Sequence, residues 1–325
     1  MKTSVVVPVY NEEGNLPELL RRLFAVMDAT GEPYELVFVD DGSRDGSLAI
    51  LKQAASERPD RVRVLELARN FGQHQAILAA FESVSGDAVV TLDADLQNPP
   101  EEIPKLLAKI REGYDVVGGV RQNRQDTFAR RLASAVVNRV TTAITRMRIT
   151  DFGCMLRAYS RDVVEEINRC DESSTFIPAL AQSFARKPTE IPVVHAPRRH
   201  GESAYSLYRL VRLNFDLLTG FSLVPLQVFG LFGSLVAIGG LAFAVFLFIR
   251  RVVHGAEAEG VFTLFAILFT LVGIAMAGLG LVGEYVGRIY QQVRGRPRFR
   301  VRRTYGLGAA APPETRTQKP ETVLR

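Results

Sequence analysis

Two uninterrupted apolar runs set the first limit on how this chain can fold. Residues 226–249 and 261–283 contain no Asp, Glu, Lys, Arg or His. As an α-helix each run would extend over about 35 Å, which is enough to cross the hydrocarbon core of a bilayer. Because both runs lie far from the N-terminus, neither has the position of a signal peptide. We therefore expect two transmembrane helices within residues 226–290, joined by a short loop over 250–260.

Basic residues flank these runs unequally. Four Arg lie in the approach over residues 198–212, two lie in the loop, and seven follow the second run within residues 288–303. Because positively charged segments stay on the cytoplasmic side of a membrane, both ends of the chain are expected in the cytoplasm. The basic cluster beside a span predicts contact with anionic lipid head groups. The sequence has no pattern of basic residues interleaved with aromatic residues, so it does not predict binding of nucleic acid.

Residues 1–200 mix charged and apolar residues in the manner of a soluble domain. Short β-branched runs, which predict buried strands, alternate with stretches of helical period. This alternation predicts an α/β fold with a Rossmann-like, mostly parallel sheet covered by helices on both faces. The expected strands are 3–9, 35–39, 61–66, 87–92, 114–119, 151–157 and 189–195, and the expected helices are 15–29, 44–57, 73–84, 100–112 and 176–184.

Three further segments differ from this alternation. Residues 127–146 are amphipathic and rich in Arg, which fits either a surface helix packed on the sheet or an interfacial helix in contact with lipid. Residues 201–225 predict an amphipathic juxtamembrane helix. Residues 291–325 form a basic tail, expected to be disordered after about residue 304 because it is rich in Pro, Thr and Ala and lacks periodicity.

An acidic stretch, Asp93-Ala94-Asp95-Leu96-Gln97, follows the fourth expected strand. Residues i and i+2 of an extended chain lie on the same side, so both carboxylates can face one point beyond the strand end, where open α/β sheets bind ligands. Two close carboxylates repel each other, and a hard divalent cation with a diphosphate would relieve that repulsion. Gln97 would add an oxygen ligand or a hydrogen-bond donor. The pattern also fits a helix N-cap at Asp95 and a solvated strand end at Asp93.

Polar side chains follow the other expected strands and should line the same edge of the sheet. Together they would offer an aromatic face, several carboxylates and a metal site, which suits a nucleoside diphosphate held through Mg²⁺ or Mn²⁺. Because the chain has no P-loop, metal and Arg would have to hold the phosphates. A hydrophilic donor beside two membrane spans points to a lipid acceptor. The residues concerned are Tyr10, Asn11, Glu12, Asp40, Asp41, Arg69, Asn70, Asp93, Asp95, Gln97 and Arg121.

A glycine pattern, Gly278-Leu279-Gly280-Leu281-Val282-Gly283, matches that of dinucleotide-binding proteins. It lies inside the second apolar run with no strand before it, so close helix packing through small residues explains it better. A Rossmann oxidoreductase therefore has little support. Glu284 follows the pattern and is expected either at head-group level or paired with an Arg of a neighbouring helix.

Several motifs together resemble a known family. Val-Pro-Val-Tyr-Asn-Glu at 7–12, Val-Asp-Asp-Gly-Ser at 39–43 and Asp-Ala-Asp at 93–95 resemble inverting glycosyltransferases with the A-type fold. The longer Asp-Ala-Asp-Leu-Gln-Asn-Pro-Pro-Glu, with two C-terminal spans ending in Gly-Glu-Tyr-Val-Gly-Arg-Ile-Tyr at 283–290, narrows the resemblance to polyprenyl-phosphate glycosyltransferases. The subgroup that transfers 4-deoxy-4-formamido-L-arabinose to undecaprenyl phosphate is resembled at 69–75, 120–126, 152–159 and 174–178.

For a UDP-sugar donor, the resemblance implies contacts to the uridine, the diphosphate and a metal. Asp93 matches a donor-contacting Asp, and Asp95 with Gln97 matches the site of a divalent cation, Mg²⁺ or Mn²⁺. Arg198 matches a diphosphate contact before a Gly-Glu-Ser turn, although Ala204 stands where the family's turn usually continues with Lys. The residues that match uridine-holding positions are Pro8, Tyr10, Glu12 and Asp41.

For an undecaprenyl phosphate acceptor, the resemblance implies that Arg121, Arg130 and Ser134 receive the phosphate. Asp151 matches the residue proposed as catalytic base, and Asp93 and Arg121 complete the expected catalytic group. Because the second pKa of a phosphate monoester is about 6, the acceptor is largely anionic near neutral pH and a strong base is not obligatory. We therefore expect Asp151 to act by positioning first and as a base second. Without the resemblance, a turn residue is the alternative for Asp151.

These matches predict a multi-pass enzyme of the bacterial inner membrane. It would transfer a sugar from a UDP-sugar, with 4-deoxy-4-formamido-L-arabinose favoured, to undecaprenyl phosphate by one inverting displacement. The product would serve lipid A modification and polymyxin resistance, and a homo-oligomer, a tetramer, is implied. The alternatives are a polyprenyl-phosphate glucose or mannose synthase and a non-catalytic membrane scaffold. A processive synthase is disfavoured, because those enzymes use a Gln-x-x-Arg-Trp motif and this chain has no Trp.

Overall fold

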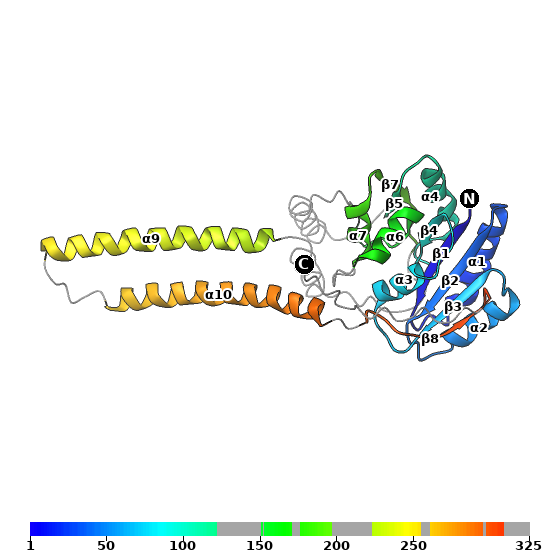
Figure 1. Ribbon diagram of the computed structural model, residues 1–325, viewed down its shortest axis with the longest axis horizontal. Coiled ribbons are helices and arrows are strands. Elements are labelled where there is room, and N and C mark those ends of the chain that lie inside the picture. The colour runs from blue at the N-terminus through cyan, green and yellow to red at the C-terminus, as the bar shows by residue number, and fades with distance from the viewer. Residues whose placement is uncertain are drawn as a thin grey trace, which may run out of the picture. The chain divides into compact units, whose positions relative to one another are not determined.

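The computed structural model describes residues 1–121, 151, 153–170, 176–196, 223–254, 261–294 and 297–308. The chain divides into two compact units, Met1–Tyr205 with Gly295–Arg325, and Ser206–Arg294. The first unit contains a mixed eight-stranded sheet, and the second contains two long apolar helices (Figure 1). The amphipathic helices predicted over 127–146 and 201–225 lie outside the described residues, apart from the last three positions of the second segment.

The centre of the sheet is parallel and almost wholly buried. β1 (Thr3–Val9) lies between β2 (Tyr34–Asp40) and β4 (Ala88–Thr91), and β3 (Val62–Leu67) pairs with β2, all in parallel. Helices cover both faces, so most side chains of these strands are apolar on either side of the sheet, and polar exceptions such as Glu35 and Glu66 are buried too. The first and last residues of each of these four strands lie within one residue of the predicted limits. The full strand order is β7-β5-β6-β4-β1-β2-β3-β8.

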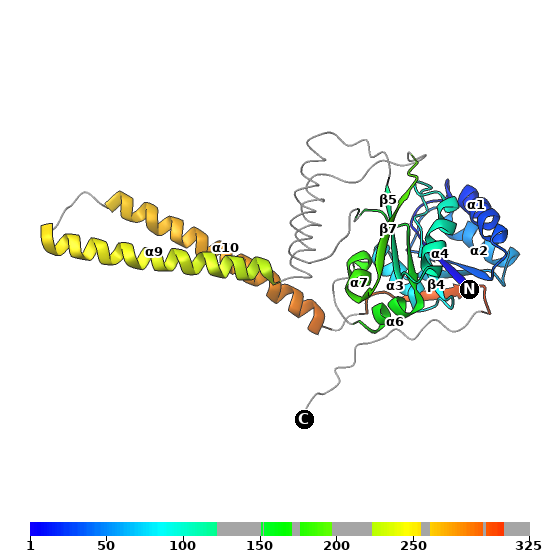
Figure 2. The same ribbon diagram turned by 90° about the horizontal axis from the view of Figure 1, so that it is seen from above.

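In the part of the chain that the structure describes, helices cover both faces of the sheet (Figure 2). On one face lie α1 (Leu16–Ala29), α2 (Ser47–Glu57) and α4 (Ile103–Arg111), which follows a short 3₁₀ turn over Pro100–Glu102. Their apolar sides, spaced three or four residues apart, share one core with alternate residues of the strands. On the other face lie α3 (Gln73–Phe81), α6 (Arg161–Arg169) and α7 (Ile177–Phe184).

One strand runs against its neighbours. β6 (Arg157–Ser160) lies between β4 and β5 (Val116–Arg121) and is antiparallel to both, while β7 (Pro188–Val193) is parallel to β5 at the sheet edge. The prediction of a strand over 151–157 was wrong for residues 151 and 153–156, and α6 was not predicted. The described residues just before β6 are not part of a strand, and side chains bind part of their backbone: the Thr91 hydroxyl donates to the Met155 carbonyl at 2.6 Å.

The basic segment beyond the second long helix returns to the sheet. β8 (Val301–Tyr305) pairs antiparallel with β3, where a basic tail had been expected. The carboxylate of Glu66 is 8% exposed and accepts hydrogen bonds from Arg302 at 3.2 Å and from the Tyr305 hydroxyl at 2.7 Å. The Lys52 ammonium lies 3.9 Å from the same carboxylate. These contacts hold residues 301–305 as an edge strand; residues 309–325 of the predicted tail lie outside the described part.

The second unit consists of α9 (Val224–His254) and α10 (Val261–Val293). Two stretches within them are long and apolar enough to cross a membrane, Leu226–Arg250 with 25 residues and Ile267–Val293 with 27. Their large apolar side chains are exposed on all sides, with Phe248 at 69% and Phe269 at 70%. A helix without a polar face is suited to lipid and not to water, as the two apolar runs predicted.

The glycine pattern at 278–283 lies inside α10, as predicted. A side chain at Gly278 would clash with the ring of Phe229 in α9, so this glycine allows the two helices to approach each other. Glu284 pairs at 2.8 Å with Arg288, one turn further along its own helix. The charged pair therefore forms within α10, whereas a neighbouring helix had been one of the expected partners.

Removing residues 297–325 should destabilise the protein more than removing residues 309–325 alone. The longer deletion removes β8, exposes the edge of β3 and removes the hydrogen bonds from Arg302 and Tyr305 to Glu66, each of which contributes about 0.5–1.5 kcal/mol. We expect the thermal midpoint of the detergent-solubilised protein to fall by at least about 4 °C for the longer deletion only. Equal midpoints for the two deletions would contradict a stabilising role of β8.

Candidate functional site

Strand direction gathers the predicted site residues at one edge of the sheet, termed the rim here. β1 to β4 are parallel and β5 points the same way, so all five end at this edge, whereas the reversed β6 begins there. The segments just beyond these strand ends contact one another in sequence around the rim. The structure therefore brings together the predicted site residues that it describes, from Tyr10 after β1 to Asp151 before β6.

The loops after β1 and β2 are tied to each other by hydrogen bonds. Asn11 has a left-handed backbone, with φ +54°, and its amide oxygen accepts the Arg44 N–H at 2.8 Å. The Glu12 N–H donates to the Ser47 hydroxyl at 2.8 Å, and the Glu12 carboxylate accepts from Asn15 at 2.6 Å. Tyr10 is 43% exposed, so its ring is accessible to a ligand, and the neighbouring Pro8 is half-buried.

Asp41 fixes the turn that follows β3. It is buried, and its two carboxylate oxygens accept the backbone N–H groups of Phe71 at 2.7 Å and Gly72 at 2.9 Å. Gly42 makes this close approach possible, because at φ +72° a Cβ there would lie 2.7 Å from the backbone of Arg69. Burial raises the pKa of Asp41 above the ordinary range despite these hydrogen bonds. A contact of Asp41 with uridine stays a prediction.

The acidic stretch lies between two other parts of the rim. The Gln73 amide donates to Asp93 at 2.5 Å, and the backbone N–H of Gln97 donates to Asp95 at 3.1 Å, across a left-handed Leu96. Burial and the neighbouring charge of Asp95 raise the pKa of Asp93 to about 7, while the Gln73 hydrogen bond and the positive charge of Arg121 act in the opposite direction. Ionising this pair without a counter-charge is therefore unfavourable.

The oxygen donors of this stretch fit a divalent cation with an open coordination shell. Asp93, Asp95 and Gln97 offer the carboxylate and amide oxygens that Mg²⁺ and Mn²⁺ prefer. Across the described residues, no three His, Cys, Asp or Glu side chains are grouped so as to enclose a metal. A cation held here would need further ligands, such as phosphate oxygens and water. The site therefore suits a cation that arrives with a diphosphate better than a permanently caged metal.

Across the rim, Arg121 at the end of β5 forms a bidentate ion pair with Asp151. The Arg121 Nε and Nη2 atoms lie 2.7 and 2.8 Å from the two carboxylate oxygens of Asp151, which also accept the Gly153 N–H at 3.1 Å. Asp151 is only 6% exposed, so the pair is largely shielded from water. The field of Arg121 reaches Asp93, since it opposes the rise in the pKa of that carboxyl.

Several site residues were either missed or cannot be placed. Gln73, which donates to Asp93, was not among the predicted site residues, and neither was Arg157, a buried charge within an apolar run. A lone Arg in an otherwise apolar strand is the signal that could have found the second residue. Arg130, Ser134 and Arg198, predicted to bind phosphates, lie outside the described residues.

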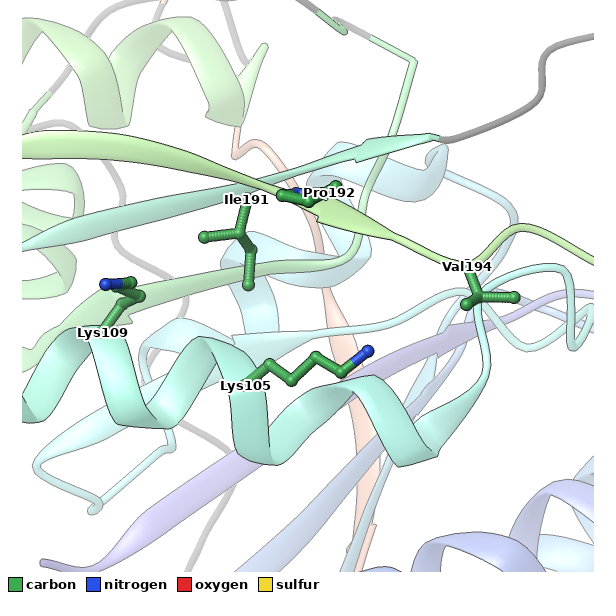
Figure 3. A pocket seen from close by; sticks show the side chains of 5 residues that line it. All are labelled: Lys105, Lys109, Ile191, Pro192 and Val194. Atoms are coloured by element: carbon green, nitrogen blue, oxygen red, sulfur yellow. The ribbon is translucent and has the colours of Figure 1, made fainter.

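A surface hollow of about 360 Å³ lies between α4 and β7, with Val194 at one end (Figure 3). Lys105 and Lys109 of α4 line it together with Ile191 and Pro192 of β7. Both lysines already pair with carboxylates of their own segment, Lys105 with Glu102 at 2.8 Å and Lys109 with Glu112 at 2.7 Å. None of the predicted site residues that the structure describes lines this hollow, so the geometry gives no reason to place the site there.

Comparison with known sequences identifies the family. Residues 4–168, from β1 into α6, match the sequence profile of Glycosyl transferase family 2. The chain belongs to this family. Undecaprenyl-phosphate 4-deoxy-4-formamido-L-arabinose transferase of Enterobacter sp. (strain 638) is 51% identical over 312 residues, which is 95% of this chain and 95% of that protein. The protein is therefore a glycosyltransferase, and the family and fold class predicted from its motifs are confirmed.

Solved structures resemble the glycosyltransferase more distantly. Glucosyl-3-phosphoglycerate synthase from Mycobacterium tuberculosis, in complex with Mn²⁺, UDP and phosphoglyceric acid, is 20% identical with a TM-score of 0.47 and covers 67% of this chain and 76% of its own. S. aureus TarS in complex with UDP-GlcNAc is 20% identical with a TM-score of 0.44 and covers 67% and 66%. Likenesses at this level assign no ligand to the glycosyltransferase.

In metal-free protein, Asp93→Asn should raise stability at pH 8 by more than at pH 5. A carboxyl whose folded pKa is about 7, above its unfolded value of about 3.9, contributes stability that is present at low pH and lost as the pH rises towards 7. Asn cannot ionise and escapes this loss. At pH 8 we expect the thermal midpoint of Asp93→Asn to be at least about 3 °C above that of the unsubstituted protein. This difference should narrow as the pH falls.

The matched control for this measurement is Asp60→Asn, since the Asp60 side chain is 76% exposed. It should leave the midpoint unchanged at both pH values. A gap between Asp93→Asn and the unsubstituted protein that is the same at pH 5 and pH 8 would show that the Asp93 carboxyl does not titrate near 7.

Proposed function

We propose that this glycosyltransferase transfers 4-deoxy-4-formamido-L-arabinose from its UDP-sugar to undecaprenyl phosphate, with inversion at the anomeric carbon. The observation that carries the proposal is 51% identity over 95% of both chains with the Enterobacter enzyme of that name. An alignment of this length spans most of the chain, so the likeness is not confined to one of its two units. Two apolar helices with exposed side chains are consistent with a lipid-linked acceptor. The product would be a lipid-linked sugar for lipid A modification and polymyxin resistance.

On the donor side, the proposal gives Asp95 and Gln97 the binding of Mg²⁺ or Mn²⁺, and gives Asp93 a contact to the UDP-sugar. The cation, when bound, supplies positive charge that stabilises the leaving diphosphate. Tyr10, Pro8, Glu12 and Asp41 would hold the uridine. Three of these lie on the linked loops after β1 and β2, so the uridine subsite would be held by the contacts between those loops.

Arg198 would contact the diphosphate, with Ala204 in place of the usual Lys. Arg121, Arg130 and Ser134 would receive the acceptor phosphate, opposite the donor. The role of Arg121 is supported by its position between two acidic parts of the rim, since it binds Asp151 and its charge acts on Asp93. One guanidinium in that position would favour an incoming anion where carboxylates alone would repel it.

The proposed step is a single displacement. A phosphate oxygen of the acceptor attacks the anomeric carbon, the bond to the UDP oxygen breaks, and UDP leaves with the electron pair. Asp151 is assigned to positioning in the first place, because Arg121 and Gly153 already donate to both of its oxygens. An acceptor phosphate that is largely ionised needs no strong base.

We further propose that α9 and α10 cross the bacterial inner membrane with both chain ends in the cytoplasm. The support is the apolar surface of both helices, together with the larger number of Arg in residues 198–212 and 288–303 than in the connecting loop 250–260. Reporter fusions at the two termini would test this orientation. A homo-oligomer, expected to be a tetramer, belongs to the same proposal and would be tested by light scattering in detergent.

A donor screen tests the proposed function directly. Purified protein, undecaprenyl phosphate and Mn²⁺ or Mg²⁺ are incubated with UDP-4-formamido-arabinose, UDP-glucose or GDP-mannose, and the lipid product is weighed by mass spectrometry. We expect a product from the formamido sugar alone. A product from only glucose or mannose would retain the site and overturn the sugar. No product from any donor, with folded protein, would favour a non-catalytic scaffold.

Asp95→Ala should reduce transfer at least about 100-fold while leaving the thermal midpoint near that of the unsubstituted protein, because the variant loses a ligand to the cation that stabilises the leaving group. Asp60→Ala, an exposed carboxylate away from the rim, should keep full activity. Retained activity in the Asp95 variant would remove the metal role from this residue.

A further inference from the structure

Arg157 is a buried charge that the donor, metal and acceptor assignments do not use. It is the first residue of β6, it is 1% exposed, and it is among the largest fully buried side chains in the described structure. Its partners in the sheet are Thr91 on β4 and Gly118 on β5. Burying a guanidinium is unfavourable unless its N–H groups find acceptors, so its contacts should reveal what it is for.

Its hydrogen bonds go to the backbone of the segment that carries Asp151. The Arg157 Nη2 donates to the Asp151 carbonyl at 2.7 Å, and the Nε donates to the Cys154 carbonyl at 2.9 Å. Two more carbonyls of this segment are bound by neighbouring strands, that of Met155 by the Thr91 hydroxyl at 2.6 Å and that of Leu156 by the Gly119 N–H at 3.0 Å. This segment, which is not itself a strand in its described residues, is thereby fixed at four carbonyls.

Three glycines leave the space that this arrangement needs. A Cβ at Gly118 would lie 3.0 Å from the Arg157 Nη1, and a Cβ at Gly119 would lie 2.9 Å from the Leu156 carbonyl oxygen. A Cβ at Gly153 would lie 2.7 Å from the Arg121 Nη2. Side chains at these positions would displace Arg157, the segment or Arg121. These glycines therefore leave room for the Arg157 guanidinium, for the Leu156 carbonyl and for the Arg121 guanidinium that pairs with Asp151.

Asp151 is held at both ends of the residue. Arg157 binds its carbonyl, while Arg121 and the Gly153 N–H bind its carboxylate. The peptide and the side chain are therefore fixed independently, and the direction of the Arg121 guanidinium depends on both. Thr91, which binds the same segment, stands two residues before Asp93, so the two acidic parts of the rim are linked through it.

We propose that Arg157 is a positioning residue for sugar transfer: by anchoring the Asp151 backbone it sets where Asp151 holds the Arg121 guanidinium relative to Asp93. This inference rests on the proposed function of the rim, because it assigns Arg121 and Asp151 to the reaction. Lys cannot replace Arg here, since its single ammonium group lacks the planar fork that reaches two carbonyls at once, and one carbonyl would lose its donor.

The test uses the full-length protein with Arg157→Lys and a matched Arg161→Lys. Arg161 also donates to a backbone carbonyl, that of Val84 at 2.7 Å, but it lies on α6 away from the rim. With the donor found in the screen, Arg157→Lys should lower kcat about 100-fold, because small misplacements of catalytic groups have effects of this size. Its donor KM should stay within about twofold, since uridine and metal residues are untouched. Arg161→Lys should keep both constants.

A double substitution separates positioning from general damage. If Arg157 acts through Asp151, adding Arg157→Lys to Asp151→Asn should lower kcat by less than about twofold beyond Asp151→Asn alone. The inference would be overturned if the loss of kcat in the double variant equalled the product of the losses in the two single variants. An unchanged kcat in Arg157→Lys would overturn it as well. Should Arg157→Lys not fold, Thr91→Val removes the hydroxyl that donates to the Met155 carbonyl of the segment, at nearly constant volume. It should lower kcat at least about fivefold, and an unchanged kcat would overturn the inference equally.

Hydrogen exchange gives a readout that does not depend on the substrate. The Gly153 N–H donates to Asp151, so peptides covering 151–157 should exchange at least about tenfold faster in Arg157→Lys than in Arg161→Lys. Unchanged exchange in Arg157→Lys would overturn the anchoring role. Faster exchange together with a folded, unsubstituted protein that transfers no sugar would overturn the proposed function and leave the anchoring of the segment supported.

Discussion

The reversed strand β6 is the constraint on which the arrangement of the rim depends. Parallel strands deliver their carboxyl ends to one edge of a sheet, and this edge would contain only the residues that follow each strand. A strand inserted in the opposite direction delivers the residues that precede it. Asp151 comes to lie beside Arg121 for this reason, although a long stretch of chain separates the two residues in sequence. The ion pair is thus a product of topology.

Much of the parallel half was predictable, because its signals are local. β-branched runs buried on both faces identify β1 to β4, and the residues that follow them identify the acidic rim at Asp41, Asp93 and Asp95. The reversed strand escaped because its apolar run, from Met155 through Leu156 to Ala158, does not reveal where pairing begins. Asp151 and residues 154–156 are buried, yet they do not form a strand, and side chains bind part of their backbone. The prediction of a strand was therefore wrong at these positions.

The edge strand β8 was missed for a related reason. Its sequence, Val-Arg-Arg-Thr-Tyr, contains charges that read as an exposed tail. In the structure the side chains of Arg302 and Arg303 are exposed, and Arg302 donates a hydrogen bond to Glu66, while the backbone of β8 pairs with β3. Edge strands need little burial, and their partner can lie hundreds of residues away, so composition carries almost no information about them. Family membership, by contrast, follows from a few short motifs at the strand ends, where chemistry restricts the residue types.

The two outermost strands have a consequence for crowding in a membrane. The sheet ends on one side with β7, in which Pro188 and Pro192 provide no backbone donor, and on the other with β8, in which Arg302 and Arg303 are exposed. Proline and charge are both features that discourage a further strand from adding to a sheet. Proteins confined to a two-dimensional layer meet one another far more often than proteins in solution. Because neither outermost strand of the described sheet favours the addition of a further strand, neighbouring copies of the protein have a poor template for joining their sheets into an aggregate.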